Sequence, residues 1–234
     1  MSEEAATVTG WKRHLLKRDT RTRTTWLLRA GLLLALFAAL RVTAPLWVRA
    51  IGESLVCSPG PRQGDAILVE NFDPEYLLFE RARDLKRSGV ASRVLVPVRV
   101  DPGTTRLNSV STGIADVMAR ISAIGPIELV PIREVEPISL NAAKDIRRYL
   151  DRERIRSVVL VTPLFRSRRS ALVYGAVMAR SGITVHCDVD DQRASVAHWS
   201  DTWHGVQNVL EQWVKLQYYR FRVMPFLCCP EDGR

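Results

Sequence analysis

Five short apolar runs alternate with helical segments over residues 65–222, and this alternation constrains the fold more than any other feature of the sequence. The runs are residues 65–70, 93–98, 127–132, 157–162 and 183–189. Short apolar runs bounded by turn-forming residues are typical of strands that are buried on both faces. Strands that alternate with helices along a chain usually pair in parallel, with the helices covering the sheet.

Apolar residues at helical spacing fill the intervals between these runs. The predicted helices are residues 74–89, 109–124, 139–153, 166–181 and 203–219. Gly89 and Gly182 stand where two of these helices should end, and Ser139 is a plausible N-cap. The expected fold class is therefore α/β: a Rossmann-like open parallel sheet with helices on both faces and right-handed crossovers, preceded by one N-terminal transmembrane helix.

The apolar segment at residues 26–48 has the composition of that transmembrane helix. Residues 30–40 carry no charge, and Trp26 and Trp47 stand where interfacial aromatic residues are expected. A spanning helix needs about 20 apolar residues. A cleaved signal peptide is one alternative, and a peripheral or buried helix is another. Residues 48–50 (Val-Arg-Ala) make a poor cleavage site, so we expect an uncleaved anchor.

Most of the excess positive charge lies beside this segment. The chain has a net charge of +9, and residues 1–49 hold nine Lys/Arg against three Asp/Glu. The positive-inside rule then predicts an N-terminus in the cytoplasm and a domain outside it, at the inner (plasma) membrane. The lipid bilayer is the expected partner. The chain has no zinc-finger, RNP or basic-zipper spacing, so we do not expect nucleic-acid binding.

The expected organisation has five parts. They are a cytoplasmic tail at 1–25, an anchor at 26–48, a Gly/Pro/Ser-rich linker at 49–64, the α/β domain at 65–222 and a C-terminal tail at 223–234.

The four cysteines are not spaced as metal ligands. Outside the cytoplasm a disulfide is possible, for example between Cys57 and Cys228 or Cys229, and free or buried thiols are equally open. The cofactor is unknown, because a G-x-G-x-x-G after the first strand and a Walker loop are both missing.

The connection after the fourth strand, residues 161–174, is the best candidate for a ligand site. Free N–H groups and the dipole at a helix start favour an anion, and guanidinium groups bind phosphate with two hydrogen bonds. The candidate ligand-binding residues are Thr162, Arg166, Ser167, Arg168 and Arg169, with Asn141 and Asn71 after neighbouring strands. Alternatively, the arginines pair with acidic residues on neighbouring loops, and Asn141 caps its helix.

His204 opens the last predicted helix, between Trp203 and Gly205. An imidazole titrates near neutral pH, so His204 is the candidate general acid or base. A structural hydrogen-bonding role is the alternative.

Three stretches resemble the YdcF/SanA/ElyC family of envelope-associated domains, over roughly residues 65–220. They are DAILVE with RARDLKRSGVASRVLV, SLNAAKDIRRYLDRERIRSVVLVTP, and FRSRRSALVYGAVM. Where that family carries glycines after the first strand, this chain has Val69-Glu70-Asn71, and Arg166 takes the place of a family histidine.

The resemblance implies a Rossmann-like fold and a domain that acts on or binds a phosphate-bearing cell-envelope intermediate. Such an intermediate would belong to polysaccharide, peptidoglycan or lipid-carrier metabolism. Whether the domain is an enzyme stays open. The alternatives are a non-catalytic assembly factor that binds an anionic glycolipid, and a purely structural anchor protein.

Overall fold

The computed structural model describes residues 26–58, 63–70, 76–190, 192 and 194–228. The chain forms two compact units, Met1–Ala44 and Pro45–Arg234. The predicted cytoplasmic tail at 1–25 lies outside the described residues.

Helix α2 (Trp26–Ser54) contains the predicted anchor and is long and apolar enough to cross a membrane. Leu34 and Phe37 are 74% and 66% exposed, as expected for side chains that face lipid rather than a protein core. The helix continues past the predicted end at Val48 and stops at Ser54.

The second unit is built on a five-stranded parallel sheet, which confirms the predicted fold class. The strands are β1 (Ala66–Val69), β2 (Arg93–Arg99), β3 (Glu128–Ile132), β4 (Ser157–Pro163) and β5 (Thr184–Asp190), in the order β3-β2-β1-β4-β5. In the central strand, Ile67 lies opposite Val94 on one side and Val159 on the other. All four residues of β1 are buried, because helices cover both faces of the sheet.

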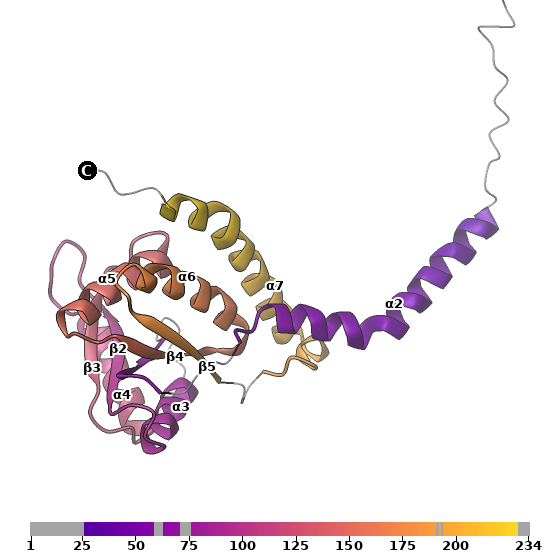
Figure 1. Ribbon diagram of the computed structural model, residues 1–234. Helices are drawn as coiled ribbons and strands as arrows, with labels where there is room; N and C mark the ends of the chain where they lie inside the picture. Colours follow the sequence, from indigo (N-terminus) through magenta and orange to yellow (C-terminus); the bar gives the residue numbers. More distant parts are fainter. Residues whose placement is uncertain (1–25, 59–62, 71–75, 191, 193, 229–234) are drawn as a thin grey trace, which may run out of the picture. The chain divides into compact units, whose positions relative to one another are not determined.

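Helices cover both faces of the sheet (Figure 1). They are α3 (Tyr76–Arg87) and α4 (Ser109–Ile121) on one face, and α5 (Ile138–Arg152) and α6 (Ser167–Ala179) on the other. Gly89 and Gly182 follow α3 and α6 with φ angles of 77° and 66°, a conformation that favours glycine and ends a helix. Ser139 lies within α5 rather than at its N-cap, which is Pro137.

Helix α7 (Trp203–Tyr218) lies beside α6 (Figure 1). It shares an apolar cluster with the last part of α2, to which Val48, Trp199, Val209 and Leu216 belong. The indole Nε1 of Trp199 donates to the carbonyl oxygen of Val48 at 2.8 Å.

The predicted linker and tail are therefore partly wrong. The start of the predicted linker, as far as Ser54, is helical, and Leu55 is buried in the same cluster as Val48. At the other end, α7 continues as η3 (Tyr219–Val223) and η4 (Met224–Cys228), and Val223 is buried in the main core. Apolar residues beyond both predicted boundaries pack into the apolar clusters of the domain, so the domain is longer than predicted at both ends.

The order of the strands fixes where a ligand is expected. The chain adds β2 and β3 on one side of β1, then crosses through α5 and adds β4 and β5 on the other side. The strand order reverses between β1 and β4. In open parallel sheets, ligands bind outside the carboxyl ends of the strands at this point.

Candidate functional site

A fully buried carboxylate lies at this reversal point. Glu70 directly follows β1 and has no exposed surface. Its oxygens accept hydrogen bonds from the hydroxyl of Thr162, in β4, and from the hydroxyl of Ser170, at 2.8 and 2.7 Å. A buried charge needs hydrogen bonds or an opposite charge to be tolerated.

Arg169 supplies that opposite charge. It is buried, and its Nη1 donates to Ser139 Oγ at 3.0 Å while its Nη2 donates to Gln212 Oε1 at 3.3 Å. Its guanidinium carbon lies 5.4 Å from the centre of the Tyr219 ring, a cation–π contact. Burial lowers the pKa of Arg169, and the negative charge of Glu70 partly opposes this effect.

Two polar atoms of this cluster lack a hydrogen-bond partner among the described residues. They are the hydroxyl of Tyr174 and the Nε of Arg169, both shielded from solvent. Burial raises the pKa of Tyr174 well above its usual value, so the phenol stays protonated. In native proteins nearly all buried polar groups form hydrogen bonds. A buried polar atom without a partner therefore either lowers the stability of the fold or lies where a water molecule or a ligand binds.

A polar cavity of about 420 Å³ adjoins the cluster at the carboxyl ends of β4 and β5. Gln212, the acceptor for Arg169, is one of its lining residues, and Arg166 is another. Its other hydrogen-bonding side chains are Asp190, His204, Gln207, Asn208 and Glu211. The cavity thus offers both donors and acceptors around one guanidinium.

The structure separates the three predicted arginines. Arg169 turns inward to the cluster, Arg166 lines the cavity, and Arg168 is exposed. The carboxylate of Glu70 partly offsets the positive charge of Arg169. Arg169 therefore does not require an external phosphate for its charge balance.

The N-terminus of α6 is covered by the segment that follows α2. The backbone N–H of Arg168 donates to the carbonyl of Leu55 at 2.9 Å, and Ser167 Oγ accepts from the N–H of Cys57 at 2.9 Å. Cys57 is disulfide-bonded to Cys187, in β5, rather than to Cys228 or Cys229. These contacts place Ser167 in a structural position and leave Arg168 outside the cavity.

The remaining predicted site residues also lie in different places. Thr162 belongs to the Glu70 cluster and His204 to the cavity wall. The side-chain amide of Asn141 donates to the carbonyls of Val135 and Glu136, at 3.0 and 3.1 Å, and so holds the loop before α5. Asn71 lies outside the described residues.

Sequence reasoning missed Glu70, Tyr174, Gln212 and Tyr219. Glu70 offered a signal, because a carboxylate that directly follows an entirely apolar strand lies at the carboxyl end of a buried sheet. The other three lie on helices, where the sequence pattern does not distinguish a buried polar residue from an exposed one.

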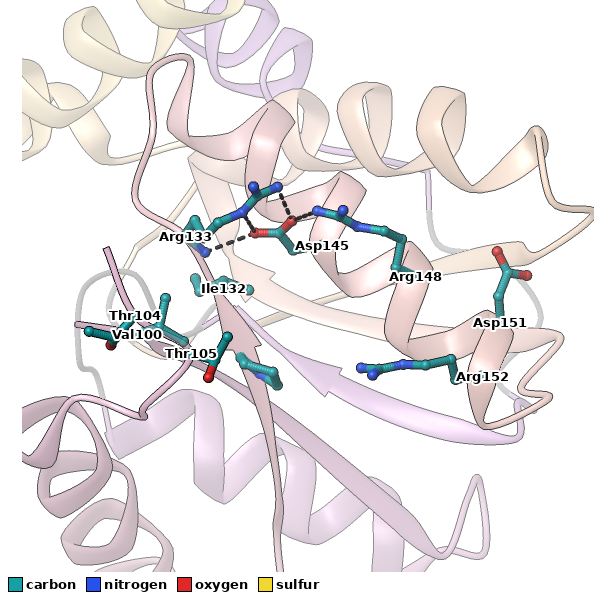
Figure 2. Close-up of a pocket in the computed structure, with 10 residues that line it drawn as sticks. Val100, Thr104, Thr105, Ile132, Arg133, Asp145, Arg148, Asp151 and Arg152 are labelled. Atoms are coloured by element: carbon teal, nitrogen blue, oxygen red, sulfur yellow. Dashed lines mark hydrogen bonds and ion pairs between the residues drawn. The ribbon is translucent and has the colours of Figure 1, made fainter. Parts of the chain in front are cut away.

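A second cavity, of about 590 Å³, lies beside α5 (Figure 2). Figure 2 shows Arg133 and Arg148 converging on the carboxylate of Asp145. Burial raises the pKa of Asp145, but hydrogen bonds from Arg133 and Arg148 outweigh it, so the pKa is lowered overall. The floor contains Val100 and Ile132, at the ends of β2 and β3.

This second cavity is the weaker candidate because it lies at β2 and β3, away from the reversal of strand order between β1 and β4. The cavity between α7 and the ends of β4 and β5 is therefore the candidate functional site.

Comparisons of the chain with protein-family models, curated proteins and solved structures found no match.

Proposed function

We propose that this chain is a membrane-anchored binding domain, held outside the cytoplasm, for a small polar ligand that carries one anionic group. A phosphate-bearing cell-envelope intermediate, as in the YdcF/SanA/ElyC type of domain, has this chemistry. The observation that carries the proposal is the position of Arg166 in a cavity that is also lined by carboxylate, amide and imidazole side chains.

The mixture of side chains in the cavity selects the class of ligand. Carboxylates such as Asp190 and Glu211 accept hydrogen bonds from hydroxyl groups, and amides such as Asn208 both donate and accept. These groups suit the hydroxyls of a sugar. The guanidinium of Arg166 suits a phosphate or carboxylate on the same molecule. A sugar phosphate satisfies both requirements, whereas a dinucleotide or nucleoside triphosphate finds no glycine-rich loop here.

The proposed location rests on two observations. The basic residues precede the apolar helix, which by the positive-inside rule leaves the domain outside the cytoplasm. The Cys57–Cys187 disulfide supports the same side, because disulfides persist in oxidising compartments.

Binding without turnover is favoured over catalysis. His204 lines the cavity and is exposed, but none of the described residues pairs with it as a nucleophile or as an orienting carboxylate. A general acid or base is usually positioned by a second group.

Native mass spectrometry of the full chain, released from detergent micelles, tests the proposal. We expect glucose 1-phosphate to bind, and to bind better than either glucose or inorganic phosphate alone, because it uses both halves of the cavity. Equal binding of glucose and glucose 1-phosphate would show that the anionic group does not contribute to binding. If none of the three compounds binds, the proposed binding function is wrong. Hydrolysis of the bound ester that depends on His204 would show that the protein is an enzyme.

A further inference from the structure

The outward face of α7 carries a stripe of exposed apolar side chains. Trp203, Leu210, Val214 and Tyr218 are 74%, 57%, 59% and 52% exposed. Their spacings of seven, four and four residues place them on one side of an α-helix. Beyond the helix, Phe221 and Phe226 are exposed as well, at 70% and 65%.

The opposite face of α7 is already used by the domain. Val209, Gln212 and Leu216 are buried, and Val209 and Leu216 belong to the cluster that contains Val48 and Trp199. A surface helix normally turns one apolar stripe inward and a polar face outward. Helix α7 carries apolar side chains on both sides, so its outward face is expected to contact an apolar partner outside the domain.

Basic side chains border the stripe. Lys215, Arg220 and Arg222 are exposed, and Glu211 is the only acidic residue between positions 203 and 228. The guanidinium carbons of Arg220 and Arg222 lie 5.8 and 6.0 Å from the rings of Phe221 and Phe226. Aromatic rings beside long basic side chains are typical of elements that lie in the headgroup region of a membrane.

The covalent chain limits how far this surface can be from a membrane that holds α2. Val48 follows Ala44, the last residue of the first unit, by four positions, a reach of at most about 14 Å. Within the second unit, Val48 accepts a hydrogen bond from Trp199 and shares a cluster with α7. No long linker therefore separates the apolar span from α7.

We propose that the outward face from α7 through η4 lies in the headgroup region of the bilayer that holds α2. The apolar stripe enters the boundary of the acyl chains, and Lys215, Arg220 and Arg222 meet anionic headgroups. A second copy of the chain covers this face less well, because a two-fold interface would bring the same basic residues of both copies together. This inference does not depend on the ligand proposed above.

Photocrosslinking of the full chain tests the proposal. The protein is reconstituted in vesicles of phosphatidylcholine and phosphatidylglycerol, with p-benzoylphenylalanine at position 210 or 214. A matched control carries the same group at Val110, which is 67% exposed on α4, on the other side of the sheet. All three positions are exposed, so the bulky group does not disturb a core.

Mass spectrometry is expected to find lipid adducts at positions 210 and 214 at several times the yield of those at 110. Equal adduct yields at all three positions would overturn the proposal. Crosslinked dimers formed from position 214 would overturn it too, since a second copy would then cover the face. No sugar phosphate takes part, so the outcome is independent of the binding assay.

Discussion

Ser170 donates its hydroxyl to both carboxylate oxygens of Glu70, at 2.8 and 2.7 Å, although the two residues are 100 positions apart in the chain. The contact joins the end of β1 to the first turn of α6, and Thr162 adds a bond from β4. The point at which the strand order reverses is thus closed by a buried carboxylate rather than by a glycine-rich turn. Gln212 links this cluster, through Arg169, to the wall of the polar cavity.

Replacing Glu70 is expected to destabilise the domain strongly. In Glu70→Gln, two hydroxyls lose an ionised acceptor and Arg169 loses the negative charge near it. The free energy of unfolding should fall by about 3 kcal/mol or more. Chemical denaturation of the full chain in detergent measures the change. In the control, Glu134→Gln, the lost partner is Arg99 at an exposed ion pair, so the loss should stay below about 1 kcal/mol. Equal losses would show that the Glu70 cluster is not a stabilising centre.

Removal of the hydroxyl should lower stability at only one of two buried or partly buried tyrosines. Tyr174→Phe deletes a buried hydroxyl without a described partner, so stability should be unchanged or rise by up to about 1 kcal/mol. Tyr149→Phe deletes a hydroxyl that donates to Glu128 at 3.2 Å, so stability should fall by about 1 kcal/mol. Thermal melts of both variants decide the matter. A larger loss for Tyr174→Phe than for Tyr149→Phe would reveal a bound water or ligand on its hydroxyl.

The disulfide should join Cys57 to Cys187 in protein isolated from its membrane. Digestion without reduction, followed by mass spectrometry, is expected to give one linked peptide pair containing these residues. Because the bond closes a loop of 130 positions, reduction should lower stability by about 5 kcal/mol. A link from Cys57 to Cys228 or Cys229 would contradict the structure. Free thiols at both positions would also argue against a domain outside the cytoplasm.

Asp145 should make stability depend on acid pH. Its pKa is lowered in the folded state, so the hydrogen bonds of its carboxylate stabilise the fold above the unfolded pKa of about 3.9. The contribution disappears as the pH falls through the lower, folded pKa. Asp145→Asn should therefore be less stable than the parent at pH 7, with the difference shrinking toward pH 3. The exposed Asp116→Asn is the control, and a deficit for Asp145→Asn that persists unchanged at pH 3 would contradict this account.

The fold was predictable because each strand and helix carries its own local signal. The apolar run before Glu70 and the glycines at 89 and 182 fixed the elements to within a few residues. The site was less predictable, because its contacts join positions far apart in the chain. The arginine segment was identified from sequence, yet only packing decides that Arg169 turns inward, that Arg168 stays outside and that Leu55 covers the helix start.

The extent of the domain was also missed for a physical reason. The Gly/Pro/Ser-rich composition after the anchor predicted a linker over residues 49–64, but only part of this range has that composition. Val48 and Leu55 are apolar, and their partners, Trp199 and Val209, come some 150 positions later. A pattern read along the chain contains no information on such a distant surface.

We expect Arg166, and not its neighbour Arg168, to contact the ligand. Isothermal titration of the full chain in detergent with glucose 1-phosphate measures the contribution of each arginine, using Arg166→Ala and Arg168→Ala as a matched pair. A charged hydrogen bond contributes about 1.5–3 kcal/mol, so Arg166→Ala should weaken binding about tenfold or more, while Arg168→Ala leaves it unchanged. Equal weakening by the two substitutions, or unchanged binding to Arg166→Ala, would contradict the claim.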